Sequence, residues 1–516
     1  MTLPATLVDS IRTHADTVVE HGRDRYGDER TPLLADALDG ETMEALPYDA
    51  RDVDGDRRLS NFAFQQEFLR VLVGLTRLTG TREYSEEAAT IVTWVFDELT
   101  DDAGLVYWGG HAAYDLDRDE VVVHKDSHEL KFEYPFYEFL WEVDEARTRQ
   151  FIETFWEAHV REWETLDFNR HGAWTDEPDV DATSEVPSPW NHEYEGGDVF
   201  FWGDGLTFVN TGSDLYYAAG VLASLTDDDG PLAWSENLAR RYVETRQEPG
   251  ISGYQFSQHP SYCDGPSIRG DRAQYQFAPY IHGDHLVYEG TLFRPRPIVQ
   301  RQQLTLGERL GERGTSFTQW AVEELRAWRQ AAYRPETNDF EPMLTDGFSL
   351  EGFVCRRDGY FGPKGRIVGP IEAGSDFFWL YAQAYRATGD SVCWQMVLDI
   401  ARGLGLGHLG PQAGSPEIHP TDTAEPLDFS TLYGLLELYE ATGRDPYLEA
   451  AATVGRELHA TGFDDSAGAF VDERGRILLD DPRPLALLHL ATVLRDGERT
   501  ALPTPVGDRR TPTGGI

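Results

Sequence analysis

Lysine is the amino acid that this chain most nearly lacks. Of its 516 residues, 45 are Lys or Arg, and lysine supplies three of them (Lys125, Lys131 and Lys364), whereas Asp and Glu number 90 and the formal net charge is −45. No basic stripe exists to neutralise phosphates, so we expect no nucleic-acid partner. Salt near 1 M shortens the Debye length to ~3 Å, which screens repulsion among acidic groups. The composition therefore predicts a halophilic protein whose acidity serves solvation.

Cysteine and long apolar runs are also scarce. The three cysteines, Cys263, Cys355 and Cys393, are odd in number and lack metal-type spacing, which fits a reducing compartment. Residues 1–20 show no basic region followed by an apolar run, and no stretch approaches ~20 apolar residues, so we expect no signal peptide and no membrane span. These features predict a cytoplasmic protein. The oligomeric state leaves no trace in the sequence.

Helical segments recur along the chain in pairs. The first members span the same number of residues and are apolar nearly all round, and most end at Thr-Gly: 65–79, 212–226, 374–388 and 428–442. After a short acidic turn, second members follow at 84–99, 232–244, 391–404 and 447–458, with a divergent one at 142–163. A glycine just past a helix end favours a turn, so each pair predicts an αα-hairpin. The pattern predicts an all-α-dominated (α/α)7-type barrel, with an (α/α)6 barrel or an ordinary helix bundle as alternatives.

Four long inserts rich in Gly, Pro and aromatic residues interrupt the helices: 105–125, 172–203, 250–297 and 340–369. Such loops on a rigid helical scaffold usually build the binding site, and 12% aromatic residues suit a sugar cleft. We expect a single catalytic domain over residues 1–496. The tail at 497–516 loses its apolar periodicity and is predicted to be disordered.

One grouping could carry metal chemistry. Glu129 stands where we expect a helical stretch to begin, and His171 lies 42 residues later, after the next helix, so an αα-hairpin could bring them together. His111, in a Gly-rich loop, could close the site, with His124 and His128 as competitors. Two imidazoles and a carboxylate are ligands that borderline divalent metals prefer.

A zinc-protease motif is excluded, because Phe132 occupies the place of its second histidine. Each member of the grouping also has an ordinary structural explanation. A histidine can be a surface or hydrogen-bonded residue, and Glu129 can be a helix N-terminal carboxylate. The guanidinium of Arg170 can belong to a structural ion pair.

The chain resembles the family 2 polysaccharide lyases, which are pectate and exopolygalacturonate lyases with an (α/α)7 barrel. The resemblance rests on these motifs: His128-Glu129-Leu130-Lys131, Phe155-Trp156, Asn169-Arg170-His171-Gly172, Gly205-Leu206-Thr207-Phe208 and Thr211-Gly212-Ser213-Asp214-Leu215. It implies that His111, Glu129 and His171 bind a transition metal, manganese first, with nickel, cobalt or zinc as alternatives. It also implies that Arg170 is the Brønsted base and that oligogalacturonate or pectate is the substrate.

The expected chemistry is β-elimination from a uronic acid. Removing the C5 proton builds charge on the C6 carboxylate, which a cation stabilises, and the C4 oxygen then departs with its bonding electrons to leave an unsaturated sugar. Guanidinium is normally protonated, so Arg170 could instead bind the carboxylate, with a tyrosine or His128 as base. Lys131, Asp214 and Arg272 are candidate substrate contacts. Asp214 and Asp376, at equivalent helix openings, are otherwise helix caps or first-turn carboxylates.

Two other functions fit the sequence. Paired carboxylates such as Asp214 and Asp376 on an α/α toroid could serve a glycoside hydrolase, for example an unsaturated uronyl hydrolase, or an epimerase, without a metal. A sugar-binding protein that keeps the fold without turnover is the third possibility.

Overall fold

The computed structural model describes most of the chain. The described residues are 2–47, 57–110, 112–123, 127–175, 188–197, 206–208, 212–246, 248–252, 255–258, 293–355, 363–415, 419–420, 428–499 and 502–507. The chain forms two compact units, each assembled from separate stretches. The first unit draws on 1–154, 173–184 and 418–508, and the second on 155–172, 185–417 and 509–516.

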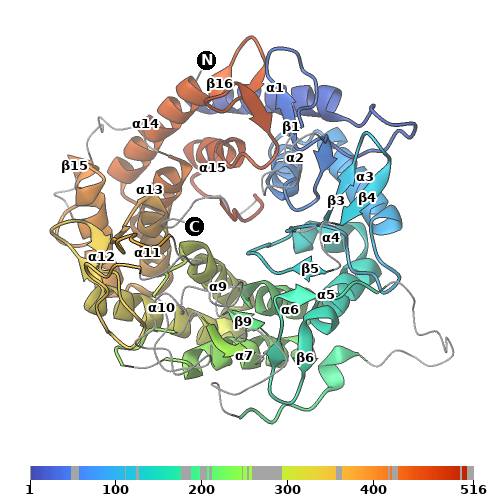
Figure 1. The fold of residues 1–516 in the computed structure, drawn as a ribbon. Coiled ribbons are helices and arrows are strands. Elements are labelled where there is room, and N and C mark those ends of the chain that lie inside the picture. Colours follow the sequence, from blue (N-terminus) through green and yellow to red (C-terminus); the bar gives the residue numbers. More distant parts are fainter. Residues whose placement is uncertain are drawn as a thin grey trace. The chain divides into compact units, whose positions relative to one another are not determined.

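The first unit consists of helices from both ends of the chain. Its helices are α1 (Leu3–Gly22), α2 (Gln66–Thr79), α3 (Glu83–Glu98), α4 (Tyr137–Val143), α13 (Phe429–Thr442), α14 (Asp445–Gly462) and α15 (Arg483–Asp496). Helix α2 pairs with α3 and α13 with α14, and the final helix α15 packs beside α1, as the blue and red ribbons of Figure 1 show. The first unit is therefore a set of αα-hairpins in which the last helix pairs with the first.

The second unit repeats the same arrangement in consecutive pairs. Its helices are α6 (Ser213–Thr226), α7 (Asp229–Glu244), α9 (Pro297–Leu310), α10 (Thr315–Ala331), α11 (Ser375–Thr388) and α12 (Ser391–Gly403). Helix α5 (Glu145–His159) begins in the first unit and ends in the second. Two 3₁₀ turns, η1 (Pro189–Asn191) and η5 (Gly311–Gly314), lie between helices.

Short strands occupy the inserts. In the first unit β1 (Ala37–Asp39) pairs with β18 (Arg476–Leu478), β16 (Phe463–Asp464) with β17 (Ala469–Phe470), and β3 (Ala112–Asp115) with both β2 (Leu59–Ser60) and β4 (Glu120–Val123). In the second, β6 (Val160–Glu162) pairs with β7 (Asp167–Phe168), β9 (Leu206–Phe208) with β10 (Gln255–Gln258), and β12 (Asp339–Phe340) with both β11 (Tyr333–Arg334) and β13 (Ile371–Glu372). Four further two-residue segments are β5 (His128–Glu129), β8 (His171–Gly172), β14 (Gly407–His408) and β15 (His419–Pro420). Strand β4 is the Glu-Val-Val-Val run of the 105–125 insert.

The sequence signals that end the first helix of a pair act through one backbone conformation. Helices α2, α11 and α13 end at Gly80, Gly389 and Gly443, which adopt left-handed φ values of 78°, 68° and 64°. Asp227 does the same after α6, with a φ of 56°. The acidic turn that follows caps the return helix: the Asp390 side chain accepts hydrogen bonds from the amides of Val392 and Cys393 at the start of α12.

The predicted helix-dominated fold of αα-hairpins is confirmed. Predicted and observed bounds agree within one residue for α2, α6, α11 and α13, and each of these helices contains an unbroken buried run, such as 213–223 in α6. The return helices bury one face, as α3 does with residues at three- and four-residue spacing. The pair α9 and α10 was not predicted, because η5, rather than Thr-Gly, joins them.

The chain beyond α15 is packed as far as it is described. Leu502 and Val506 are 7% and 4% exposed, and the Pro503 carbonyl lies 3.0 Å from Nε2 of His489, where a disordered tail was expected. Residues 508–516 lie outside the described residues. The single domain over 1–496 stays a prediction. Among the described residues, no helix has both the length and the apolar character needed to cross a bilayer.

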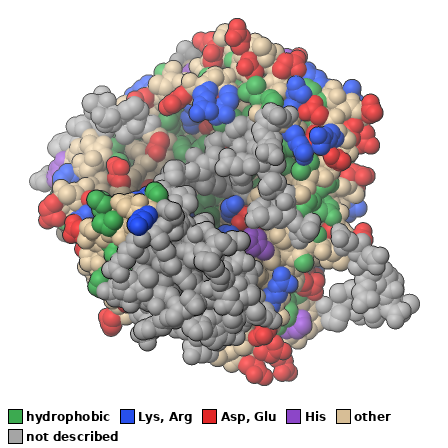
Figure 2. Space-filling model, viewed as in Figure 1, with side chains coloured by type: hydrophobic (Ala, Val, Ile, Leu, Met, Phe, Trp, Pro, Cys, Tyr) green, Lys and Arg blue, Asp and Glu red, His purple; other side chains and the backbone are tan. Residues whose placement is uncertain are grey.

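Acidic side chains dominate the charged surface. On the described part of the face in Figure 2, Asp and Glu are spread widely, with Arg between them. Many of the described arginines form ion pairs with these carboxylates, such as Arg499 with Glu437 and Glu440 at 2.9 and 2.6 Å. Fixed pairs of this kind reduce the local repulsion, although exposed pairs stabilise a fold only slightly.

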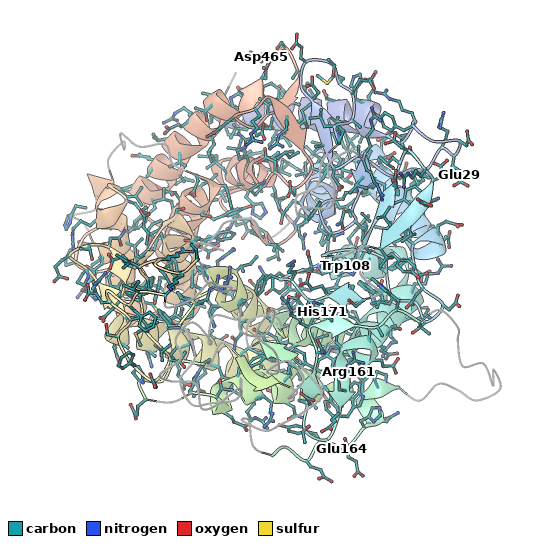
Figure 3. The ribbon with its side chains drawn as sticks, viewed as in Figure 1. Glu29, Trp108, Arg161, Glu164, His171 and Asp465 are labelled. Carbon is teal, nitrogen blue, oxygen red and sulfur yellow. The ribbon has the colours of Figure 1, made fainter. Side chains whose placement is uncertain are left out.

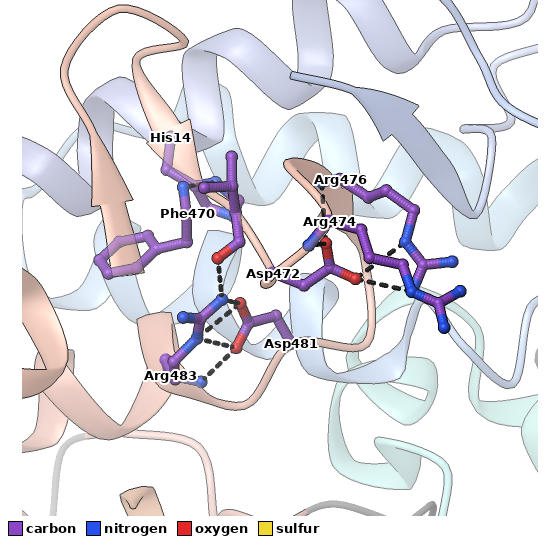
Figure 4. A network of polar contacts seen from close by, with 8 residues as sticks. His14, Phe470, Asp472, Arg474, Arg476, Asp481 and Arg483 are labelled. Atoms are coloured by element: carbon purple, nitrogen blue, oxygen red, sulfur yellow. Dashed lines mark hydrogen bonds and ion pairs between the residues drawn. The ribbon is translucent and has the colours of Figure 1, made fainter. Parts of the chain in front are cut away.

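Buried histidines join the early and late parts of the first unit. His14 of α1 is 1% exposed, and its Nδ1 accepts a hydrogen bond from the Phe470 amide at 3.3 Å (Figure 4). Beside it, Arg483 binds both carboxylate oxygens of Asp481 and the Val471 carbonyl. Burial lowers the pKa of His14 to about 4. Asp481 raises this pKa and Arg483 lowers it, both by less than burial does. Burial likewise lowers the pKa of His489 to about 3.

Both histidines make stability sensitive to mild acid. In the unfolded chain each imidazole binds a proton near pH 6.5, whereas in the folded protein it stays neutral until the pH is much lower. As the pH falls from 6.5 toward 4, the unfolded chain therefore binds more protons than the folded protein. We expect the contribution of His14 to the free energy of unfolding to be fully present above pH 6.5. It should fall by up to about 3 kcal/mol as the pH approaches 4. In His14→Asn, the amide oxygen can accept the Phe470 N–H. The free energy of unfolding of this variant, measured in urea, should fall less between pH 6.5 and pH 4 than that of the native protein. His21→Asn, on the same helix but partly exposed, is the control; equal slopes in both variants would contradict the prediction.

Candidate functional site

A tight loop precedes His111. Asn61 holds Gly109 with two hydrogen bonds: its Nδ2 donates to the Gly109 carbonyl at 2.9 Å, and its Oδ1 accepts from the Gly109 amide at 3.0 Å. Gly109 has a φ of 86°, which favours glycine. A Cβ built on Gly109 would lie 3.9 Å from Nε2 of His128 and from Oε1 of Glu133. The loop therefore lies directly against strand β5.

Strand β5 presents a buried carboxylate. Glu129 is 2% exposed, and the Nζ of Lys131 lies 2.8 Å from its Oε2. The lysine side chain is 40% exposed, so its ammonium reaches the carboxylate from the solvent side. A buried carboxylate requires compensation by positive charge or hydrogen bonds. Glu129 is thus an oxygen donor that already contacts a cation.

Aromatic rings surround His128. The Trp108 and Trp174 ring centroids lie 6.0 and 5.4 Å from that of His128, which is fully buried. The Tyr107 ring lies 4.7 Å from Trp174, and both are only partly buried. Of this aromatic group, Tyr107, Trp108, His128 and Trp174, only Tyr107 and Trp174 have exposed surface that a sugar ring could contact.

Arg170 and His171 lie in the second unit, after the β6–β7 hairpin. Asn169 accepts a hydrogen bond from the His171 amide at 2.9 Å through its Oδ1, and Arg161 donates to the His171 carbonyl at 3.2 Å. Figure 3 labels His171 and Arg161, together with Trp108 of the first unit. Both Arg170 and His171 are partly exposed. They therefore stand on an ordered segment from which a ligand can be reached.

The expected helical setting of this grouping is wrong. Glu129 lies in strand β5 and not at the start of a helix, because Phe132 adopts a φ of 62° and Tyr134 precedes a proline. Helix α4 begins only at Tyr137. Likewise, α5 ends at His159, and a β-hairpin separates it from Arg170. Glu129 is therefore not a helix N-terminal carboxylate.

Several predicted site residues are not placed. His111, His124 and Arg272 lie outside the described residues. Over the described ranges, which exclude His111, no group of three or more His, Cys, Asp and Glu side chains is arranged to hold a metal. The assignment of His111, Glu129 and His171 as ligands stays a prediction.

Asp214 lies in the first turn of α6 with no exposure, and Asp376 takes the same place in α11. Burial raises the pKa of Tyr216, and the Asp214 charge raises it further. The pKa of Tyr242 is also raised by burial, by Tyr216 and by Asp214. Both aspartates are first-turn carboxylates, as one interpretation held. The role of Asp214 as a substrate contact stays a prediction.

Sequence reasoning missed the residues that support the grouping. Asn61 is 48 positions from Gly109, and no local pattern connects them. Trp174 could have been found, because it follows His171 by three residues in an insert already expected to bind a sugar. His159 has no sequence signal beyond its place at a helix end.

Comparison with known proteins defines the class. Residues 31–515 match the family described as periplasmic pectate lyase. Over 512 residues the chain is 31% identical to a pectate disaccharide-lyase of Dickeya dadantii (strain 3937), covering 95% of this chain and 89% of that protein. The protein is therefore a polysaccharide-cleaving lyase. It belongs to the periplasmic pectate lyase family, and the predicted family and enzyme class are confirmed.

Two solved structures of sugar-active enzymes share a distant likeness with this chain. A cellobiose 2-epimerase from Bacillus thermoamylovorans B4167 is 11% identical, with a TM-score of 0.43 over 94% of this chain and 98% of that one. An unsaturated glucuronyl hydrolase from Bacillus sp. GL1 is 14% identical, with a TM-score of 0.38 over 96% and 98% of the two chains. Scores this low support no functional argument.

The predicted cytoplasmic location is wrong, because the family that the chain belongs to is described as periplasmic. The prediction rested on the composition of residues 1–20 and on three cysteines. The cysteine content was misleading, because a protein without disulfides can work in either compartment.

The Lys131–Glu129 contact is testable by stability. Lys131→Met removes a cation from a carboxylate that is 2% exposed, so we expect a loss of about 1 kcal/mol in the free energy of unfolding, limited by the exposure of the lysine. Urea denaturation in dilute salt measures it. Lys364→Met changes an exposed lysine of the second unit and should leave stability unaltered. Equal stabilities of the two variants would mean that the contact contributes nothing.

Proposed function

We propose that this lyase cleaves pectate or oligogalacturonate by metal-assisted β-elimination. The observation that carries the proposal is the 31% identity to a pectate disaccharide-lyase over 95% of the chain. The substrate is then an acidic oligosaccharide, and the name of that relative makes an unsaturated disaccharide the expected product. Lys131, Arg272 and Asp214 remain the candidate substrate contacts.

The chemistry of Glu129 supports a cation beside it. Its carboxylate is buried and already has an ammonium at 2.8 Å, so a positive charge is favourable at this oxygen. Glu129 and His171, with His111, would supply the mixed oxygen and nitrogen donors that manganese, nickel, cobalt or zinc accept. When bound, the ion would polarise the C6 carboxylate and stabilise the charge that develops there.

The residues of this chain would then act on the uronate in distinct ways. Trp174 and Tyr107 would stack on the sugar ring and exclude water from one face. Lys131 would move its ammonium from Glu129 to a substrate carboxylate. Arg170 would take the C5 proton if its guanidinium is neutral in the complex, or bind the C6 carboxylate if it stays protonated, with a tyrosine or His128 as base.

The reaction type is testable with polygalacturonate. We expect a growing ultraviolet absorbance from the C4–C5 double bond, loss of activity after dialysis against a chelator, and recovery with Mn²⁺. Reducing ends formed without this absorbance would indicate a hydrolase, and binding without products would indicate a sugar-binding protein. Activity that survives chelation undiminished would remove the metal from the proposal.

Arg170 is testable by two substitutions. Arg170→Ala should lower kcat at least 10³-fold while KM for trigalacturonate changes little, because a base acts only in the transition state. If Arg170 instead binds the carboxylate, Arg170→Lys should keep substantial activity and Arg170→Ala should raise KM. Arg77→Lys, which alters a surface arginine of α2 that pairs with Glu142, is the control. Unchanged turnover in Arg170→Ala would exclude the residue from the mechanism.

A further inference from the structure

One buried imidazole contacts the backbone on both sides of the Arg170-His171 pair. His159, the last residue of α5, has no solvent exposure. Its Nδ1 lies 2.7 Å from the Asn169 carbonyl, and its own carbonyl accepts a hydrogen bond from the Asn169 amide at 2.9 Å. A carbonyl oxygen can only accept, so Nδ1 of His159 carries the proton. Side chain and main chain of His159 thus hold one residue, Asn169.

The same ring also determines residue 172. A Cβ placed on Gly172 would lie 2.8 Å from Nε2 of His159 and 2.9 Å from Cδ2 and Cε1. Real Cβ atoms do not approach so closely, so the Gly172 backbone packs flat against the imidazole and no larger residue fits. Phe155, one turn earlier in α5, supports the ring from another side at a centroid distance of 5.4 Å.

Between these two contacts, Asn169 transmits the restraint to His171. Its Oδ1 accepts the His171 amide at 2.9 Å, so the side-chain amide also has a defined orientation. Asn169 is 6% exposed, and Arg170 and His171 are partly exposed. The functional pair therefore projects from a four-residue segment whose two ends rest on one buried ring.

We propose that His159 is a positioning residue for Arg170 and His171. It acts through Asn169 and Gly172 and touches neither substrate nor metal, since it has no exposed surface. The inference rests on the proposed function. Displacing a reacting group by about 1 Å can cost on the order of 10²-fold in rate, so the restraint matters for turnover more than for substrate binding.

A pair of variants separates the hydrogen bond from the packing. His159→Phe keeps an aromatic ring against Gly172 but loses the Nδ1–H, whereas His159→Asn keeps an N–H donor and loses the ring. We expect His159→Phe to lower kcat 10- to 100-fold with KM for trigalacturonate within 3-fold, and to weaken Mn²⁺ binding measured calorimetrically without substrate at least 10-fold. His159→Asn should recover part of both losses.

Hydrogen exchange gives a readout that needs no activity. In the native protein, the Asn169 and His171 amides should exchange slowly, and in His159→Phe they should exchange at least 10-fold faster, with unchanged protection in α11. If His159→Phe does not fold, Asn169→Ala removes the bond to His171 and leaves the buried ring in place, with the same expected loss of kcat.

The outcomes distinguish the two proposals. Native protein without eliminase activity would overturn the proposed function. Native eliminase activity together with kcat and Mn²⁺ affinity within 2-fold of native in His159→Phe would overturn the positioning role alone.

Discussion

A left-handed residue at the end of a buried helix is the constraint from which the rest of this architecture follows. Helices α2, α6, α11, α13 and α15 all end at such a residue: Gly80, Asp227, Gly389, Gly443 and Gly497. After α2, α6, α11 and α13 this conformation reverses the chain within a few residues, and the next helix packs back on the first. Buried helices thus acquire partners without long connections, and the long connections remain available for function.

The parts of the fold that the sequence predicted are those with local causes. Thr-Gly and Thr-Asp ends, acidic caps such as Asp390 and unbroken apolar runs depend on residues a few positions apart, and they predicted α2, α6, α11 and α13 within one residue. The pair α9 and α10 lacks the Thr-Gly signal and was missed. The packing of α1 on α15 involves residues more than 450 positions apart, for which the sequence has no local signal.

The residues of the candidate site stay a prediction, and the helical setting that was expected for them is wrong. The identities of Glu129, Arg170 and His171 came from motifs, yet the helical periodicity that was extended over Glu129 was misleading, because Phe132 is left-handed and Pro135 follows soon after. The supporting residues act through hydrogen bonds to backbone groups outside their own local pattern, 48 positions away for Asn61 and 10 for His159, and His159 also acts through the face of its ring. Such contacts depend on the folded backbone and leave no periodic pattern.

The rarity of lysine makes the Glu129–Lys131 pair unusually accessible to chemistry. An amine-selective acylating reagent meets only three lysine side chains and the chain's amino terminus. Lys131 differs from an ordinary surface lysine in holding its ammonium against a buried carboxylate. The acylation rate of this one amine, followed by mass spectrometry of a single peptide, would therefore report directly on what occupies the neighbourhood of Glu129, with little background from the remaining surface.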